Sequence, residues 1–302
     1  MPAKGQQALW MLLASFLFAT MGVCIKFASA HFNSFEIVCY RGIFGVLFLY
    51  GLTRARGVSL RSGVPMMHVW RSIVGTVSLT AWFYSIAILP LGTAMTLNYM
   101  SSIWIATFLL GGALLLQGRN TPIARQGPLF ATVLAGFAGV AMVLRPSLAP
   151  DQVLGAIVGL ASGVTSALAY LQVSALSRVG EPESRTVFYF SLGAVIAGAV
   201  GMVFVGVSPW DWTQALWLLP IGLLAVLGQL CMTRAYASGA TLVVANLQYS
   251  GIVFAALYGL VVFGDRLPWI GWAGMALIIV SGIAATVLRE REVPDSPAEE
   301  HA

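Results

Sequence analysis

Residues 241–263 read TLVVANLQYSGIVFAALYGLVVF, a continuous stretch without a charged side chain. An α-helix needs about 20 mostly apolar residues to cross the hydrocarbon core of a bilayer, whereas a membrane β-strand needs only about 9 to 11. A stretch of this length and composition therefore predicts a transmembrane helix, in which the backbone satisfies its own hydrogen bonds inside lipid.

Nine further stretches of the same kind lie elsewhere in the sequence. The predicted spans are residues 7–28, 33–52, 69–89, 93–115, 128–145, 153–176, 187–207, 214–235, 241–263 and 268–288. The composition agrees, because 59% of the side chains are hydrophobic and only 9% are charged, whereas about a quarter are charged in a soluble domain. We therefore expect an all-α membrane protein with ten transmembrane helices and a disordered cytoplasmic tail, residues 290–302.

The basic residues predict the orientation of the bundle. An even number of spans places both termini on one side, and most of the 16 lysines and arginines lie in or beside the loops on that side. Lys26, Arg145 and Arg266 lie at the opposite ends of their spans. Because cytoplasmic loops carry an excess of basic residues, we expect a multi-pass protein of the inner (plasma) membrane with both termini in the cytoplasm. The net charge of +5 is scattered between apolar blocks, which excludes nucleic acid as a main partner.

The two halves of the sequence are related. Residues 93–115 read TAMTLNYMSSIWIATFLLGGALL, and a shift of 148 residues places Thr93 on Thr241, Asn98 on Asn246, Ser102 on Ser250 and Gly111 on Gly259. A nearly equal shift places residues 13–15 on the identical residues 160–162. We therefore expect two five-helix repeats, residues 1–147 and 148–289. Because five is odd, the second repeat inserts upside down, and such inverted repeats bind a solute near mid-membrane and work by alternating access.

Three features then point to a family: Arg41 early in the second span, residues 87–102 linking the third and fourth spans, and their echo in residues 235–250. With the ten helices in two halves, these features resemble the EamA branch of the drug/metabolite transporter superfamily, over essentially the whole chain. The resemblance implies a cavity lined by spans one, three, four, six, eight and nine. It also implies export of amino acids or metabolites, or exchange of nucleotide-like solutes.

The chain departs from the family at the ends of two spans. Members often close spans four and nine with Gly-Glu, whereas here Arg119 follows Gly118 and Asp265 follows Gly264. The role of that acid in relatives therefore does not carry over to the first half.

Arg41 is the charged residue expected to lie deepest in the membrane. It comes eight residues after Asn33, the outer end of the second span, which places it about 12 Å deep at about 1.5 Å per residue. A charge at such a depth costs at least about 2.5 to 3.5 kcal/mol on insertion scales, so it should face protein, water or an anion. Two interpretations stay open: contact with an anionic group of the substrate, or a structural arginine that ties helices together.

Four other charged residues are expected nearer the membrane surfaces. Lys26 and Glu36, at the outer ends of the first two spans, form either a gate or coupling site or an interfacial pair of snorkelling side chains. Arg71 and Arg234 lie near cytoplasmic ends and are expected to snorkel to the surface.

Spans four and nine each carry one polar stripe. The helical spacing i, i+3, i+4 is followed by Asn98, Ser101 and Ser102 and again by Asn246, Tyr249 and Ser250. Such side chains either hydrogen-bond between helices or line a cavity, and two matching stripes favour the cavity. Further candidates for substrate binding are Trp82, Tyr84, Tyr99, Trp104, Tyr170 and Gln229.

The side chains missing from the spans restrict the chemistry. No acidic residue is expected at mid-membrane, which disfavours permanently cationic drugs as substrates. The sequence has no Walker motif, no paired histidine ligands and no serine, histidine and aspartate set at membrane depth. We therefore expect no enzymatic activity, no catalytic residues, no metal site and no cofactor.

The function favoured by these residues is secondary transport of a small metabolite, an amino acid or related organic solute, with export preferred. A nucleotide-type exchanger is an alternative, although phosphates usually require several lysines or arginines in the cavity. A non-transporting membrane scaffold or sensor is the alternative from a different class. The expected partners are the solute and membrane lipid, and a homodimer is left open.

Overall fold

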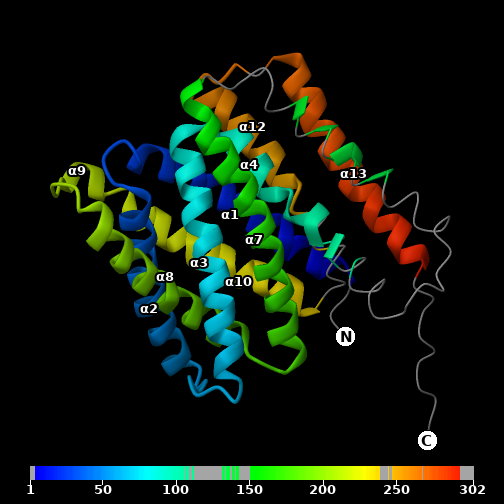
Figure 1. Cartoon of the computed structure of the whole chain (residues 1–302). Helices are drawn as coiled ribbons and strands as arrows, with labels where there is room; N and C mark the ends of the chain where they lie inside the picture. Colours follow the sequence, from blue (N-terminus) through cyan, green and yellow to red (C-terminus); the bar gives the residue numbers. More distant parts are fainter. Residues whose placement is uncertain are drawn as a thin grey trace, which may run out of the picture.

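The computed structural model describes residues 4–105, 107–108, 111, 131–132, 134–136, 138–139, 141–142, 150–238, 244, 247–266 and 268–292. Over these residues all regular structure is helical, without a strand (Figure 1). Five helices are long and apolar enough to cross a membrane: Ala8–Ala28, Ser34–Ala55, Val153–Arg178, Glu183–Val205 and Trp212–Ala237. The prediction of a helical membrane protein is confirmed.

Each described helix overlaps one of the predicted spans, although several differ from it in length. In the first half they are α1 (Lys4–Ala28), α2 (Ser34–Ala55), α3 (Pro65–Ile88) and α4 (Leu91–Tyr99). After the short 3-10 turn Pro150–Gln152 they are α7 (Val153–Arg178), α8 (Glu183–Val205), α9 (Trp212–Ala215), α10 (Leu218–Ser238), α12 (Ser250–Val262) and α13 (Trp269–Glu292). Half of the predicted fifth span, together with Gly118, Arg119, Arg145, Asn246 and residues 293–302, lies outside the described residues.

Local sequence signals set where helices begin. At the start of α2 the Asn33 side chain accepts hydrogen bonds from the backbone N–H groups of Phe35 and Glu36, at 3.0 and 3.1 Å, and the Glu36 carboxylate accepts from the Asn33 N–H at 2.7 Å. This reciprocal arrangement is a capping box. Pro65 occupies the first turn of α3, where its missing N–H would be unpaired in any case. The third helix therefore begins four residues before the predicted span.

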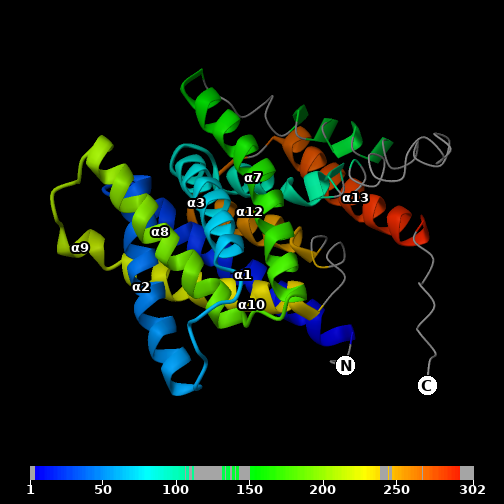
Figure 2. The same ribbon diagram turned by 60° about the horizontal axis from the view of Figure 1, so that its bottom comes forward.

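The described helices of the two halves pack against each other in matched pairs. The most extensive contacts join α2 to α8, α3 to α7 and α1 to α10, and the first two pairs can be followed in Figures 1 and 2. If α1 is exchanged with α7, α2 with α8, α3 with α10 and α4 with α12, the pair α3–α7 becomes α10–α1 and the pair α4–α7 becomes α12–α1. Both products are observed contacts, and α3–α8 and α10–α2 correspond in the same way.

Two helices are interrupted at corresponding positions. After α4, Met100 forms a turn before the helical residues 101–105, and the Ile103 N–H bonds to the Met100 carbonyl at 2.9 Å. Before α12, residues 248 and 249 form a turn, and the Gly251 N–H bonds to the Gln248 carbonyl at 2.9 Å. Positions 100 and 248 are separated by the shift that aligns the two halves. Such broken helices are typical of transporters at their binding sites.

Candidate functional site

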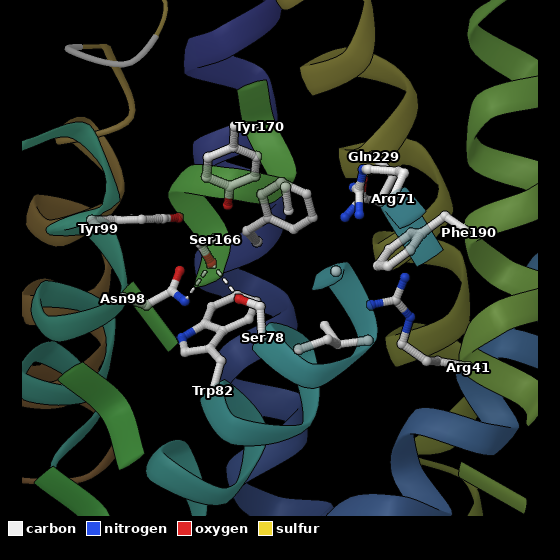
Figure 3. A pocket seen from close by; sticks show the side chains of 14 residues that line it. Arg41, Arg71, Ser78, Trp82, Asn98, Tyr99, Ser166, Tyr170, Phe190 and Gln229 are labelled. Carbon is white, nitrogen blue, oxygen red and sulfur yellow. Dashed lines mark hydrogen bonds between the residues drawn. The ribbon is translucent and has the colours of Figure 1, made fainter. Parts of the chain in front are cut away.

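A cavity lies where the two halves of the bundle meet. It is a small space of about 30 Å³, bounded by side chains from α1, α2, α3, α4, α7, α8 and α10. The described residues that line it are Phe18, Arg41, Arg71, Gly75, Ser78, Leu79, Trp82, Asn98, Tyr99, Ser166, Ala169, Tyr170, Phe190 and Gln229 (Figure 3). None of them is acidic.

Two arginines dominate this cavity. Arg41 on α2 and Arg71 on α3 are each only 3% exposed. Their guanidinium carbons lie 5.3 and 4.2 Å from the centroid of the Phe190 ring on α8, which lies between the two groups in the view of Figure 3. The Nε and Nη1 atoms of both side chains have no hydrogen-bond partner among the described residues. Two cations are therefore buried, and each keeps hydrogen-bond donors without a partner among the described residues.

The two guanidinium groups also repel each other. Their central carbons are at most about 9.5 Å apart, the sum of the two ring distances, so the repulsion is at least about 1.7 kcal/mol at an effective dielectric constant of about 20. The face of an aromatic ring attracts a cation, and Phe190 offsets part of this energy. The described residues therefore offset the repulsion only in part.

The prediction that Arg71 snorkels to the surface is wrong, and Arg41 is not alone at depth. Arg71 is buried because α3 starts at Pro65, which puts Arg71 six residues, or about 9 Å, inside the helix. A proline at the first helical turn is the sequence signal that locates it. Arg234, in contrast, has a half-exposed side chain that lies 3.9 Å from Glu183 and packs over the Trp10 ring.

Gly75 makes room for the Arg71 guanidinium group. A Cβ atom at this position would collide with Arg71 Nη1 and would approach the Phe190 ring to 2.8 Å. Gly75 lies one helical turn after Arg71 on α3. Its missing side chain therefore lets Arg71 fold back along its own helix into the cavity.

The opposite wall of the cavity is a network of neutral polar groups. Asn98 on α4 donates from Nδ2 to Ser162 Oγ and Ser166 Oγ of α7, at 3.0 Å each, and Ser78 on α3 donates to the Ser162 carbonyl at 3.0 Å. Ser78 and Ser166 also share a hydrogen bond. Asn98 thus combines both roles that the sequence left open, because it bonds between helices and lines the cavity.

The structure brings together only part of the predicted set. Arg41, Trp82, Asn98, Tyr99, Tyr170 and Gln229 line the cavity. The cavity lining does not include the buried Ser101, Ser102 and Tyr249 or the partly buried Trp104 and Ser250. Tyr84 lines a separate apolar groove on α2, α3, α7 and α8. The sequence missed Arg71, Ser78, Ser166 and Phe190, which come from helices without a recognisable polar stripe.

The two predicted gating residues do not contact each other. Glu36 is fully buried, and its carboxylate accepts hydrogen bonds from Ser208 N at 2.9 Å and Ser208 Oγ at 2.8 Å. His31 and Asn33 add bonds to the carbonyls of Pro209 and Gly206. We call this closed contact between residues 29–36 and 206–211 the Glu36 end.

Lys26 closes a different contact near the same end. Its ammonium group donates to the Leu89 carbonyl at the end of α3 and lies 5.7 Å from the centroid of the Phe263 ring. Lys26 therefore joins α1 to the α3–α4 connection. Neither Lys26 nor Glu36 snorkels as a free pair at the surface.

A second polar contact, not predicted, lies at the other end of α2 and α8. Glu181, with a side chain only 6% exposed, accepts hydrogen bonds from Ser62 Oγ at 2.7 Å and Arg185 Nη1 at 3.0 Å. His68 Nε2 lies 3.2 Å from the same carboxylate. Burial raises the pKa of Glu181, but these hydrogen bonds outweigh it and hold the pKa below its usual value. We call this contact between residues 59–68 and 181–185 the Glu181 end.

The family assignment follows from comparison with known sequences. The sequence pattern of the EamA-like transporter family matches residues 6–145 and, a second time, residues 153–287. The chain belongs to this family. The resemblance to the drug/metabolite transporter superfamily is thereby confirmed, and this EamA-like transporter is a multi-pass membrane protein that carries a small molecule.

Several relatives of this EamA-like transporter are named transporters. The pseudopaline exporter of Pseudomonas aeruginosa (strain UCBPP-PA14) is 35% identical over 274 residues, which cover 90% of this chain and 93% of the relative. The riboflavin transporter of Rhizobium johnstonii is 27% identical over 282 residues, covering 91% and 89%. The S-adenosylmethionine uptake transporter of Rickettsia bellii is 25% identical over 138 residues, 45% of either chain. A solved crystal structure superimposes with a TM-score of 0.66 over 97% of this chain and 100% of its own, and at 19% identity it shows the fold alone.

Proposed function

We propose that this EamA-like transporter exports a small organic solute with a carboxylate, such as an amino acid or a related metabolite, across the inner membrane by alternating access. The observation that carries the proposal is the cavity, which both halves line and in which the Nε and Nη1 atoms of two buried guanidinium groups have no hydrogen-bond partner among the described residues. A solute carboxylate would pair with these donors by strong, charge-assisted hydrogen bonds. The exporter among the relatives supports the direction.

The proposal includes two inverted five-helix repeats, residues 1–147 and 148–289, with both termini in the cytoplasm. Three observations support it: the helix pairs that correspond when the halves are exchanged, the helix breaks at positions 100 and 248, and the family pattern that matches once in each half. In such a fold one half rocks against the other around a fixed site.

The contacts at the two ends of α2 and α8 are the natural gates of this cycle. Opening toward the outside would break the bonds between Glu36 and Ser208, and opening toward the cytoplasm would separate residues 59–68 from residues 181–185. The breaks at Met100 and Gln248 offer positions where the helices beside the cavity can bend.

A nucleotide-type exchanger is the second candidate, and one observation favours it. Phosphates usually require several cations in the cavity, which argued against an exchanger while Arg41 was the one expected there. Arg71 adds a second cation to the same cavity and so weakens that argument. Uptake of labelled nucleotides into proteoliposomes preloaded with nucleotides would support exchange over export of carboxylates.

Cysteine accessibility tests the carrier directly. In a variant with Cys24, Cys39 and Cys231 replaced by serine, a cysteine at Ser78 faces the cavity, and a cysteine at the neighbouring, 55% exposed Val77 faces outward from α3. We expect a charged, membrane-impermeant thiol reagent to label position 78 from at least one side of the membrane, and to leave position 77 unlabelled because lipid covers it. A cysteine at position 78 that never reacts would favour the scaffold instead.

A further inference from the structure

We propose that the solute carries two separate carboxylate groups, one for the guanidinium group of Arg41 and one for that of Arg71. This inference rests on the proposed function and names the substrate class of the same cavity.

The first step is charge balance. Both guanidinium groups are positively charged at any physiological pH, and no described residue that lines the cavity is acidic. The buried carboxylates of Glu36 and Glu181 are engaged with Ser208 and with Arg185 at the two ends of the bundle. A solute with one carboxylate would leave one cation buried and unpaired, which is strongly unfavourable. A solute with two carboxylates would neutralise both.

The second step is geometry. The ring of Phe190 lies between the two guanidinium groups, whose central carbons are 5.3 and 4.2 Å from the ring centroid, and it keeps them apart as two separate sites. In Figure 3 both groups face the space bounded by Trp82, Ser78 and Tyr170. A single phosphate concentrates its charge at one point, whereas two carboxylates on a short chain can each meet one guanidinium group. The arrangement therefore favours a diacid.

The third step concerns the part of the solute between its acidic groups. Trp82 Nε1 and Tyr99 Oη have no hydrogen-bond partner among the described residues, and both side chains line the same cavity. Their rings offer apolar contact and their polar atoms offer two donors. The chemistry of this lining matches a carbon chain with oxygen substituents and does not match a positively charged group on the solute.

The experiment uses purified, full-length protein and matched pairs of probes. Thermal unfolding is measured with succinate, glutarate and adipate, and with the monoamide of each, which has the same length and one charge fewer. We expect at least one diacid to raise the melting temperature and to bind at least about tenfold more tightly than its monoamide, because a ligand stabilises the state it binds. Arg41→Gln and Arg71→Gln should each abolish this preference, whereas Arg234→Gln, at the surface, should preserve it.

Gly75→Ala gives a second variant that keeps both charges. It displaces the Arg71 guanidinium group, so it should weaken diacid binding about tenfold and leave monoamide binding within about twofold.

The outcomes separate the two proposals. Equal binding of diacids and monoamides, or a preference that survives in both arginine variants, would overturn the diacid inference and leave the carrier intact. Binding of an amino acid with one carboxylate, together with no binding of any of the three diacids, would also overturn the diacid inference and leave the carrier intact. If no solute binds and the cysteine at position 78 never reacts, both proposals fall.

Discussion

The guanidinium groups of Arg41 and Arg71, thirty residues apart on consecutive helices, both lie against the ring of Phe190. No carboxylate lies beside them among the described residues that line the cavity. Each guanidinium group is buried and keeps unpaired donors. A pair of this kind makes the empty protein less stable than the loaded one. It therefore links the stability of the fold to the presence of an anion.

The first prediction is that removing one of these charges stabilises the empty protein. Arg41→Gln should raise the free energy of unfolding by about 1 to 2 kcal/mol, because it relieves a like-charge repulsion of that order and a buried, unpaired charge. The measurement is thermal unfolding of purified protein without added solute. Arg234→Gln removes the same charge from a half-exposed site and should change the stability by less than about 0.5 kcal/mol. If Arg41 were a structural tie between helices, the variant would instead be destabilised.

The second prediction concerns the neutral wall of the cavity. Ser166 accepts from Asn98 and shares a hydrogen bond with Ser78, and each of those residues keeps one bond to Ser162 when Ser166 is lost. Ser166→Ala should therefore lower the free energy of unfolding by only about 0.5 to 1.5 kcal/mol. The adjacent Thr165 bonds within its own helix and supplies the control, since Thr165→Ala should be nearly neutral. Chemical unfolding followed by tryptophan fluorescence compares the two, and equal effects would contradict a role for Ser166 in joining α3, α4 and α7.

The helices could be predicted from the length of the apolar stretches, because a backbone that spans lipid must form all of its hydrogen bonds within its own segment. One boundary that failed is the start of α3. A count of apolar residues begins the third span at residue 69, whereas the helix begins four residues earlier, with Pro65 in its first turn. Because of this difference, Arg71 was expected at the membrane surface and is found in the cavity.

The cavity itself was only partly predictable, for a physical reason. Asn98 and Tyr99 stand out in an apolar span, and Arg41 stands out by its charge. Which face of α7 or α8 meets them depends on how the helices rotate about their axes, and helices that are apolar on all sides give no periodic signal for that rotation. Ser166 and Phe190 therefore could not be singled out, nor could the contact between Glu36 and Ser208, which joins residues 172 positions apart.

The third prediction concerns the Glu36 end. Ser208→Ala removes the hydroxyl bond to Glu36 and keeps the backbone bond, so it should weaken the closed contact by about 0.5 to 1.5 kcal/mol. The population open at this end should rise roughly two- to tenfold. Spin labels at the exposed residues Ala30 and Trp212 report the opening as a longer distance in pulsed electron resonance. Thr213→Ala, in α9 beyond the contact, serves as the control, and an unchanged distance distribution in Ser208→Ala would exclude this contact as a gate.

The fourth prediction is the pH dependence of the Glu181 end. The hydrogen bonds from Ser62, Arg185 and His68 hold the pKa of Glu181 below its usual 4.5 despite burial. A carboxyl whose pKa is lowered by folding stabilises the folded state above the unfolded pKa, and this stability is lost as the pH falls through the folded pKa. At pH 7 the wild type should therefore be more stable than Glu181→Gln by about 1.5 to 3 kcal/mol, the range for hydrogen bonds to a charged group.

That advantage should shrink as the pH is lowered from about 4.5 toward 3, because protonated Glu181 resembles glutamine. Melting temperatures of both proteins between pH 7 and pH 3 measure it. Asp151→Asn changes an exposed carboxylate that makes no contact with this cluster, so its curve should run parallel to that of the wild type. A difference between wild type and Glu181→Gln that stays constant down to pH 3 would show that the Glu181 charge contributes nothing to holding residues 59–68 against residues 181–185.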